Sequence, residues 1–422
     1  MFLNKPRAIQ YMRDHQLDAL VATSPVNITY FTGYHIWLDP LFKDYMMTPG
    51  ASSDVAQRYA IFTADGKTAL VVGSLMAINA TDLEVSDRAL VGDPGVDMTL
   101  SPADLSPDTP ERIRLLFSTL RSADASASPT DALVRLLRAY GLAEARIGIE
   151  MEGLTSAAKS SLAPAMPRAV LKDCTNTIRL IRMVKTPIEI ERLARATEIA
   201  EKAAAESLAL AQPGAWTVDL LARYRLGLAE RGADFDHFAY GIHGLGIATE
   251  TNHRLRPQDV EYVDFGCRYG YYTSDSGLTL AVQPLGSELA RRYEAVKRCM
   301  EAGEASLQPG IRASAVQEAM QKSFADDGIT GAFPHGHGVG LELRDYPILV
   351  PDTRLRIRDD CVDVPADVPL EADMVINLEA PVFMPGVGSL HVEKTFVLTP
   401  TGSRPLAPQA RETPFLPAVS IH

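Results

Sequence analysis

The sequence predicts an α+β protein in which a smaller α/β domain at residues 1–172 precedes a larger domain at residues 173–422. Three observations lead to this prediction. The chain has 422 residues, which is long for a single hydrophobic core. Helical and strand patterns alternate in the N-terminal part, whereas a helix–turn–helix plan occurs twice in the larger domain. Hydrophobic residues make up 46% and charged residues 22% of the chain, a composition typical of globular proteins.

The N-terminal domain begins with one predicted helix and three predicted strands. Residues 5–18, KPRAIQYMRDHQLD, have the apolar spacing of an amphipathic helix. The runs ALVATS (19–24) and YAIFTA (59–64) have the composition of strands, and KTALVVG (67–73) follows as a hairpin partner. Together these elements indicate a small α/β domain.

An insertion rich in aromatic residues and methionine occupies residues 34–54. One interpretation is a loop that packs on its own domain. The other is a lid or interface segment that reaches a site elsewhere, because long loops often carry function. Trp37 and Tyr45 are the side chains in this insertion that we consider as candidates for closing a pocket.

A strong helix start marks the larger domain. Thr186, Pro187 and Glu189 have the spacing of an N-cap, a proline at the first helical position and a capping box. Beyond it, residues 205–234 and 302–330 share one plan of helix, QPG triplet and amphipathic helix. The two QPG triplets lie 96 residues apart, which predicts two similar halves of one domain rather than a solenoid of short repeats.

The first half of the larger domain ends in a predicted hairpin with two acidic residues. Asp264 and Asp275 are equidistant from a turn near residues 269–270, so in a tight hairpin they would face each other. Like charges directly opposite one another are destabilising, and such a pair needs a cation or a shared proton. The alternative is a pair of exposed aspartates on a frayed hairpin.

The second half carries two further acids beside apolar strands. Glu379 follows MVINL and Glu393 precedes KTFVL, and buried glutamate is rare unless it is paired or bound to metal. A histidine from PHGHGVGLELRDYP (334–347) would complete the set. Two divalent cations would neutralise four carboxylates, and an oxygen-rich site with one imidazole suits Mn²⁺, with Fe²⁺, Co²⁺ or Zn²⁺ as alternatives. Two metals ~3.5–4 Å apart can share a bridging hydroxide, which indicates hydrolysis of a polarised carbonyl.

These residues resemble the creatinase, prolidase and aminopeptidase group of metallopeptidases with the pita-bread fold. The pattern of that group is an aspartate, a second aspartate eleven residues later, a histidine within GHGxG and two glutamates, here Asp264, Asp275, His337, Glu379 and Glu393. Residues 17–34 are similar to the start of the group's N-terminal domain, and residues 178–196 are similar to its inter-domain helix. The resemblance therefore covers nearly the whole chain.

The resemblance implies a fold, an activity and a role for each ligand. The fold would be a pita-bread catalytic domain with an internal pseudo-two-fold repeat, preceded by a creatinase-type α/β domain. Asp264 would hold one metal, Asp275 and Glu393 would bridge both metals, and His337 with Glu379 would complete the second site. The implied activity is cleavage of a peptide or amide C–N bond, by default in Xaa-Pro dipeptides or related peptides, and the implied assembly is a homodimer.

Two positions depart from the pattern of this group. Peptidases of the group usually have a second histidine seven residues after the ligand histidine, where this chain has Arg344. They often have arginine two residues before the last glutamate, where this chain has His391. Arg344 stays charged and could clamp a carboxylate or stabilise an oxyanion, or it could pair with Asp345 at the surface. His391 could serve as a proton relay or have a structural role.

Other histidines are candidates for the substrate pocket. The group has a pocket histidine before the first ligand aspartate, at a greater separation from it than His253. His253 is preferred for this role here, and the alternatives are His243 or neither of the two. We expect His335 to shape the pocket or to orient His337, and we expect the glycines of residues 334–347 to leave room for substrate. Trp37 would close a pocket from the N-terminal domain of a partner in a homodimer.

Three alternatives to a peptidase remain open. Arg344 and His391 favour a specialised amidohydrolase of the creatinase or ectoine hydrolase kind. The others are a lyase acting on small sulfonium compounds and a non-catalytic binding module, against which the intact ligand set argues.

The overall charge and the cysteine pattern limit the partners and the compartment. The net charge of −12 argues against nucleic acid or an anionic membrane as a partner. The N-terminus lacks a secretory apolar core, no apolar run is long enough to span a membrane, and the four cysteines are scattered. We therefore expect free thiols and a cytoplasmic location.

Overall fold

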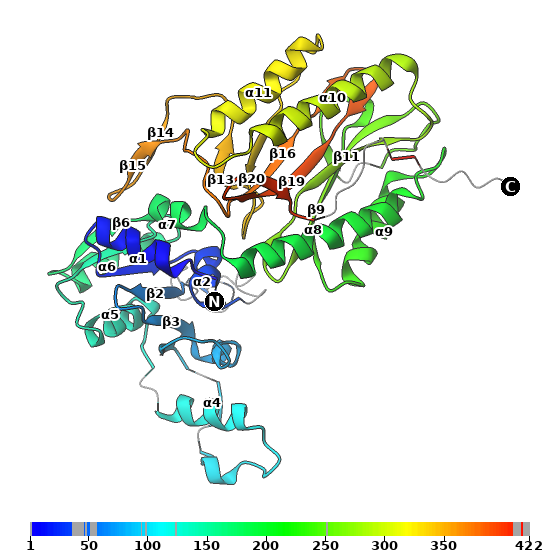
Figure 1. Ribbon diagram of the computed structural model, residues 1–422. Coiled ribbons are helices and arrows are strands. Elements are labelled where there is room, and N and C mark those ends of the chain that lie inside the picture. Colours follow the sequence, from blue (N-terminus) through cyan, green and yellow to red (C-terminus); the bar gives the residue numbers. More distant parts are fainter. Residues whose placement is uncertain are drawn as a thin grey trace. The chain divides into compact units, whose positions relative to one another are not determined.

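The computed structural model describes residues 2–35, 46, 49–50, 57–93, 95–97, 99–122, 125–249, 252–407 and 415–416. The chain divides into two compact units, one of Met1–Ile181 with Ile357–Asp363 and one of Arg182–Arg356 with Val364–His422. Figure 1 shows the elements of both units. The predicted domain boundary after residue 172 stays a prediction.

The N-terminal unit is built on a six-stranded mixed sheet with the order β4-β3-β2-β1-β5-β6. Its strands are β1 (Ala19–Ala22), β2 (Tyr59–Thr63), β3 (Thr68–Gly73), β4 (Asp87–Val91), β5 (Arg146–Ile149) and β6 (Val170–Asp173). β2 and β3 form the predicted antiparallel hairpin, whereas β1 pairs with β5 and β5 pairs with β6 in parallel. The predicted strands and the α/β character of this unit are confirmed.

Helices complete this unit, some of them packed on the sheet and one, at residues 111–122, packed against the 3₁₀ helices. They are α1 (Lys5–Asp14), α2 (Pro25–Thr32), α4 (Glu111–Ser122), α5 (Pro129–Ala139), α6 (Ser156–Ala165) and α7 (Thr175–Arg182), with 3₁₀ helices η1 (Ser74–Ala80) and η2 (Pro102–Asp104). α1 begins where the Asn4 side chain accepts a hydrogen bond from the Arg7 backbone N–H, at 3.3 Å, so the predicted first helix is confirmed. All four cysteines are free, as their spacing predicted.

The aromatic insertion falls mainly outside the described residues. Trp37 and Tyr45 both lie outside them, so the interpretation of residues 34–54 as a lid or an interface segment stays a prediction.

The larger unit contains a ten-stranded sheet with the order β13-β12-β16-β19-β11-β9-β7-β8, in which β10 also pairs with β9 and β20 with β19. Its strands are β7 (Asp234–Tyr240), β8 (Ala248–Thr249), β9 (Val260–Tyr269), β10 (Tyr272–Thr273), β11 (Ser276–Ala281), β12 (His335–Gly338), β13 (Asp345–Leu349), β16 (Val375–Glu379), β19 (Glu393–Thr399) and β20 (Gly402–Pro405). A small ribbon in this unit pairs β17 (Val382–Met384) with β18 (Gly388–Leu390). A second ribbon pairs β14 (Arg356–Arg358) with β15 (Asp363–Pro365) around the segment Ile357–Asp363, which belongs to the N-terminal unit.

Four helices accompany this sheet: α8 (Pro187–Leu208), α9 (Thr217–Ala229), α10 (Ser287–Ser306) and α11 (Ala313–Asp326). α8 begins with the predicted capping box, in which the Thr186 backbone N–H donates to Glu189 Oε2 at 2.7 Å. α8 and α9 contact β9 and β7, and α10 and α11 contact β16 and β13 (Figure 1). No described helix combines the length and apolar character that a membrane crossing needs.

The two halves of this unit repeat one local structure after their first helix. Gly214 and Gly310, the glycines of the two QPG triplets, have left-handed φ angles of 91° and 90°. The Gly214 N–H donates to the Leu255 carbonyl at 2.7 Å, and the Gly310 N–H donates to the Leu370 carbonyl at 2.8 Å. The predicted internal repeat is therefore confirmed, and the halves join where β11 pairs with β19.

A buried ionic network fixes the segment that follows β12. The Asp345 carboxylate has 3% of its side chain exposed and lies 3.1 Å from Arg182 Nη2 and 3.2 Å from Lys185 Nζ. Burial raises the pKa of the Asp345 carboxyl, but the two cations lower it below its usual value overall. The network ties the start of β13 to the residues just before α8.

We predict that Asp345→Asn lowers the free energy of unfolding by about 3–5 kcal/mol, because Lys185 loses its buried ion-pair partner and Arg182 keeps only the partly exposed Glu342. Urea denaturation of both proteins at pH 7 measures this difference.

The matched control is Asp326→Asn, which breaks an exposed ion pair with Lys322 and should cost less than about 1 kcal/mol. Because the pKa of folded Asp345 is depressed, its contribution is present above the ordinary aspartate pKa of about 3.9 and is lost as pH falls below it. The difference between wild type and Asp345→Asn should therefore shrink below about pH 4. Equal stabilities at pH 7 would contradict the network's role.

Candidate functional site

Acidic side chains lie in one row across the seam between the two halves of the large sheet. On β11, Gly277 is opposite Asp264 of β9 on one side and Glu393 of β19 on the other. Glu393 is in turn opposite Glu379 of β16, and Glu379 is opposite His335 of β12. Side chains opposite one another in antiparallel strands project to the same face. The row therefore gathers three acids from both halves on one face.

Asp275 joins this row from the segment between β10 and β11, two residues before Gly277. It does not face Asp264 across the hairpin, so that part of the sequence prediction is wrong. The turn is centred on Gly270 and Tyr271, which both have positive φ, and the strands on either side pair two residues away from the predicted register.

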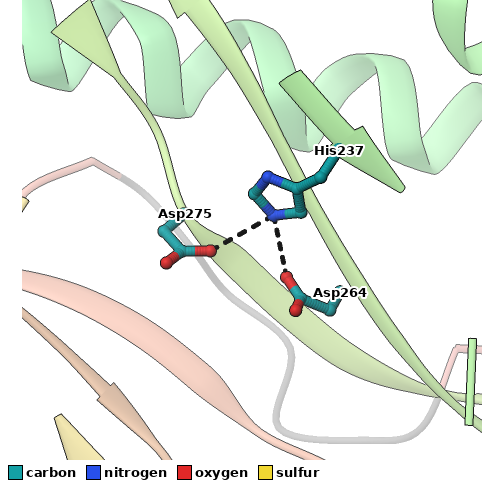
Figure 2. A group of neighbouring side chains, drawn as sticks. All are labelled: His237, Asp264 and Asp275. Atoms are coloured by element: carbon teal, nitrogen blue, oxygen red, sulfur yellow. Dashed lines mark hydrogen bonds and ion pairs between the residues drawn. The ribbon is translucent and has the colours of Figure 1, made fainter. Parts of the chain in front are cut away.

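His237 of β7 brings the two aspartates together, and sequence reasoning missed it. Its Nε2 lies 2.9 Å from Asp264 Oδ1 and 3.3 Å from Asp275 Oδ1, as Figure 2 shows. Burial lowers the pKa of His237, but its contacts with Asp236, Asp264 and Asp275 raise it overall to about 12. A Cβ on Gly266 would lie 2.3 Å from His237 Cε1, so glycine is needed there to admit the imidazole.

His337 connects the acids of the two halves. Its Nε2 lies 3.2 Å from Asp275 Oδ2 and 3.2 Å from Glu379 Oε1, yet this buried atom makes no hydrogen bond of normal geometry. Its Nδ1 lies 3.0 Å from the Gly338 carbonyl, so Nδ1 is the nitrogen that donates. In the neutral imidazole the Nε2 lone pair then faces two carboxylates, an arrangement that favours a proton or a metal ion between them.

The glycines near His337 admit neighbouring strands rather than substrate. A Cβ on Gly336 would lie 2.5 Å from the Asn377 carbonyl of β16, and a Cβ on Gly338 would lie 2.2 Å from the Tyr346 carbonyl of β13. The expectation that these glycines leave room for substrate is therefore wrong at these two positions. They allow β12 to lie between its neighbours.

An imidazole and a guanidinium lie against Glu379. His335 Nε2 is 3.0 Å and Arg344 Nη2 is 3.1 Å from Glu379 Oε1. The Arg344 side chain is 53% exposed, so it reaches from solvent to a predicted ligand. The alternative in which Arg344 pairs with Asp345 is not found, because the Asp345 carboxylate contacts the cations of the buried network instead.

His391 lies beside Glu393 and is completely buried. Its Nε2 is 2.8 Å from Glu393 Oε2, and burial lowers its pKa to about 4. The ring of Tyr262 lies 4.2 Å away between centroids, and the Tyr262 hydroxyl donates to Asp264 Oδ2 at 2.8 Å. Tyr262 and Asn377, whose Nδ2 donates to Glu393 Oε1 at 2.5 Å, are further contacts that the sequence did not reveal.

His243 and His253 lie in a separate group. Their rings are 5.0 Å apart, and His253 Nε2 is 2.9 Å from Asp259 Oδ2. Within the described part of the chain, no hydrogen bond or ion pair joins either histidine to the five predicted ligands. Their assignment to a substrate pocket stays a prediction.

The acidic set has the chemistry of a site for divalent cations. Burial raises the pKa of Asp264 and Glu393 above the usual range of a carboxyl group. At Asp275 and Glu379 burial acts in the same direction, but nearby histidines lower the pKa overall. Four clustered carboxylates, of which that of Asp264 is partly exposed, with imidazoles between them match the oxygen-rich donor set of Mn²⁺ and related metals.

Comparison with known proteins agrees with this geometry. The family description "Metallopeptidase family M24" matches residues 173–400, which is more than half of the chain. The chain belongs to metallopeptidase family M24. Residues 6–184 match the Creatinase/Prolidase N-terminal domain.

Individual relatives of the family are distant. The chain is 28% identical to an Xaa-Pro dipeptidase of Pyrococcus horikoshii over 57% of this chain and 67% of the relative. It is 27% identical to a probable dipeptidase, PepE, of Mycobacterium tuberculosis over 63% of this chain and 70% of the relative.

Solved structures of the family share the fold. An X-Pro aminopeptidase of Thermotoga maritima has a TM-score of 0.71 at 17% identity, covering 98% of this chain and 99% of the other. The prolidase of Pyrococcus furiosus has a TM-score of 0.66 at 19% identity, covering 96% of this chain and all of the other. Family membership and these structures confirm the predicted pita-bread and creatinase-type architecture, and the family identifies the chain as a metallohydrolase.

We predict that Gly277→Ala lowers metal affinity at the acidic row by about tenfold or more, because disturbing the residues that orient ligands typically has this effect. The new Cβ would lie 2.4 Å from Glu393 Oε2 and from the His391 ring. Isothermal titration calorimetry with Mn²⁺ measures the affinity of each variant.

Gly402→Ala is the control, since a Cβ at Gly402 meets no atom within 4 Å. It should leave Mn²⁺ affinity unchanged. Equal affinities for Gly277→Ala and Gly402→Ala would show that the acidic row does not hold the metal.

Proposed function

We propose that this protein is a dinuclear metal-dependent hydrolase that cleaves a C–N bond in a small peptide or amide. The observation that carries the proposal is the row of Asp264, Glu393 and Glu379 on one sheet face, with His337 between the acids of the two halves. Such a group is destabilising by itself and is suited to two divalent cations.

The proposed ligands follow the family pattern residue by residue. Asp264 would hold one metal, Asp275 and Glu393 would be shared by both, and His337 with Glu379 would complete the second. Mn²⁺ is the proposed metal, with Co²⁺, Zn²⁺ or Fe²⁺ as alternatives. When bound, the two ions lower the pKa of water and polarise a carbonyl group, which is the chemistry that amide hydrolysis needs.

The surrounding side chains orient these ligands. Tyr262 donates a hydrogen bond to Asp264, Asn377 donates one to Glu393, and His237 contacts Asp264. These hydrogen bonds orient the carboxylates and determine which of their oxygens remain free to coordinate a metal. Residues that contact metal ligands commonly have this effect. His391, next to Glu393, remains our candidate for holding a proton during the reaction.

The substrate by default is an Xaa-Pro dipeptide or a related peptide, since relatives of this chain are described as Xaa-Pro dipeptidases. Arg344 supports the second candidate, a small-molecule amidohydrolase, because it stands beside Glu379 where the family's peptidases usually have histidine. A lyase acting on the same site is a third candidate. Membership of an enzyme family argues against the non-catalytic alternative. A homodimer and a cytoplasmic location complete the proposal.

The proposal is tested by counting metals and then comparing substrates. Protein prepared with Mn²⁺ should hold two more metal ions per chain than Asp275→Ala, measured by plasma mass spectrometry. Less than one metal per chain, unchanged in Asp275→Ala, would contradict the dinuclear site. Assays with Xaa-Pro dipeptides, creatine-like and cyclic amides and a sulfonium then separate the peptidase, amidohydrolase and lyase candidates.

We predict that Arg344 clamps a substrate carboxylate. Its guanidinium is partly exposed and reaches Glu379, so one face remains free for a second carboxylate. For a substrate with a free carboxylate, Arg344→Ala should raise KM by about tenfold or more, with a smaller effect on kcat.

The same substrate with its carboxylate converted to an amide is the matched control, and its KM should change little. Arg404→Ala, which removes an exposed arginine on β20, should leave KM unchanged for both substrates. An equal rise in KM for acid and amide would contradict the clamp.

A further inference from the structure

A second group of potential metal ligands lies outside the acidic row. His243, Asp259 and Glu261 each offer one ligand atom, and these atoms all lie within 4.8 Å of one another. His243 belongs to the 3₁₀ turn η3 (Ile242–Gly244), Asp259 directly precedes β9, and Glu261 is the second residue of that strand.

This group lies on the opposite face of the sheet from the acidic row. Side chains alternate along a strand, so Tyr262 and Asp264 share one face of β9 while Glu261 and Val263 share the other. Tyr262 contacts Asp264 on the face of the acidic row. Leu280 of β11 is opposite Glu261 in the sheet. Both Leu280 and Val263 belong to a hydrophobic cluster that includes residues of α8 and α9, so Glu261 is on the face that these helices cover. The second group is therefore distinct from the catalytic site.

Glu261 is the most unusual member of this group. It is 1% exposed, and neither carboxylate oxygen accepts a hydrogen bond of normal geometry from any described residue. Burial and the neighbouring Asp259 raise its pKa to about 8, although the His243 backbone and Arg256 act in the other direction. A buried carboxylate without partners is costly, and coordination of a cation is one way to satisfy it.

The surroundings hold the other two ligands in place. Asp259 Oδ2 accepts hydrogen bonds from the Arg256 backbone N–H at 2.8 Å and lies 2.9 Å from His253 Nε2. His243 has a φ of 53°, a left-handed backbone conformation that residues other than glycine adopt uncommonly. Such a conformation persists where the surrounding structure enforces it. Its carbonyl accepts a hydrogen bond from the Gly386 N–H at 2.9 Å.

A cationic nitrogen already lies among these atoms. Arg256 Nη2 is 2.7 Å from His243 Nδ1 and 3.1 Å from Asp259 Oδ1. The Arg256 side chain is 48% exposed, so it can leave the group for solvent without losing a buried environment. The position of Arg256 shows that this group stabilises a positive charge. Arg256 does not, however, form a hydrogen bond of normal geometry with Glu261.

We propose that His243, Asp259 and Glu261 form a second metal site that binds a divalent cation of the Zn²⁺ class. Imidazole nitrogen and carboxylate oxygen are both ligand types that zinc accepts, and the formal charge of −2 on this group balances the ion. On binding, the Arg256 guanidinium moves to solvent, while His253 keeps Asp259 oriented. The metal would link η3 to β9 and, through the His243 carbonyl, to the Gly386 backbone. This inference does not rest on the proposed function.

The test uses zinc alone and a background in which a catalytic ligand is removed. After dialysis against a series of Zn²⁺ concentrations, the zinc bound per chain is measured by plasma mass spectrometry. The Asp275→Ala variant should retain a zinc ion at the second site. The double variant Asp275→Ala/Glu261→Gln should bind that ion at least about tenfold more weakly. The control is the double variant Asp275→Ala/Glu318→Gln, in which an exposed glutamate on α11 is changed instead of Glu261. This control should bind the zinc ion as Asp275→Ala does. Circular dichroism checks that each variant is folded.

Anomalous diffraction at the zinc edge on wild-type crystals decides the location without any variant. The proposal expects a peak between His243, Asp259 and Glu261. Absence of this peak in zinc-loaded crystals, or equal zinc affinity with and without Glu261→Gln, overturns the second site. Either result leaves the dinuclear proposal unaffected, because that proposal is judged by metal at Asp275.

Discussion

Repulsion among four clustered carboxylates, three of them buried and that of Asp264 partly exposed, is the constraint on which the rest of this structure depends. Asp264, Asp275, Glu379 and Glu393 come together at one seam of the large sheet, where water is largely excluded. Like charges at such distances repel strongly in a medium of low dielectric constant, and histidines offset only part of that charge. The arrangement is stable when cations lie among the carboxylates, so we expect metal binding to stabilise the fold at this seam.

The internal repeat explains how the chain builds this charge from distant segments. Each half supplies two of the acids, and pairing of β11 with β19 brings the halves together at Gly277 and Glu393. Glycine is required where a side chain would occupy space that a ligand or a neighbouring strand already fills, as at Gly266 and Gly338. The sheet thus contributes register and close approach, while the acidic side chains contribute the chemistry.

Much of this could be predicted from the sequence because it depends on local signals. The Thr186 capping box, the two QPG triplets and the spacing of the acids each correspond to a local structure. The hairpin register could not be predicted, because the turn contains Tyr271 at positive φ, a conformation that its residue type does not favour. His237 was missed for a related reason: β7 shifts register between Phe235 and His237, so strand pattern alone does not show that it meets Asp264.

The central claim is that two cations lie in the seam between the halves, and anomalous diffraction from Mn²⁺-loaded crystals tests it most directly. The account predicts two peaks ~3.5–4 Å apart, both next to Asp275 and Glu393. A single peak, or none between these two carboxylates, would contradict it.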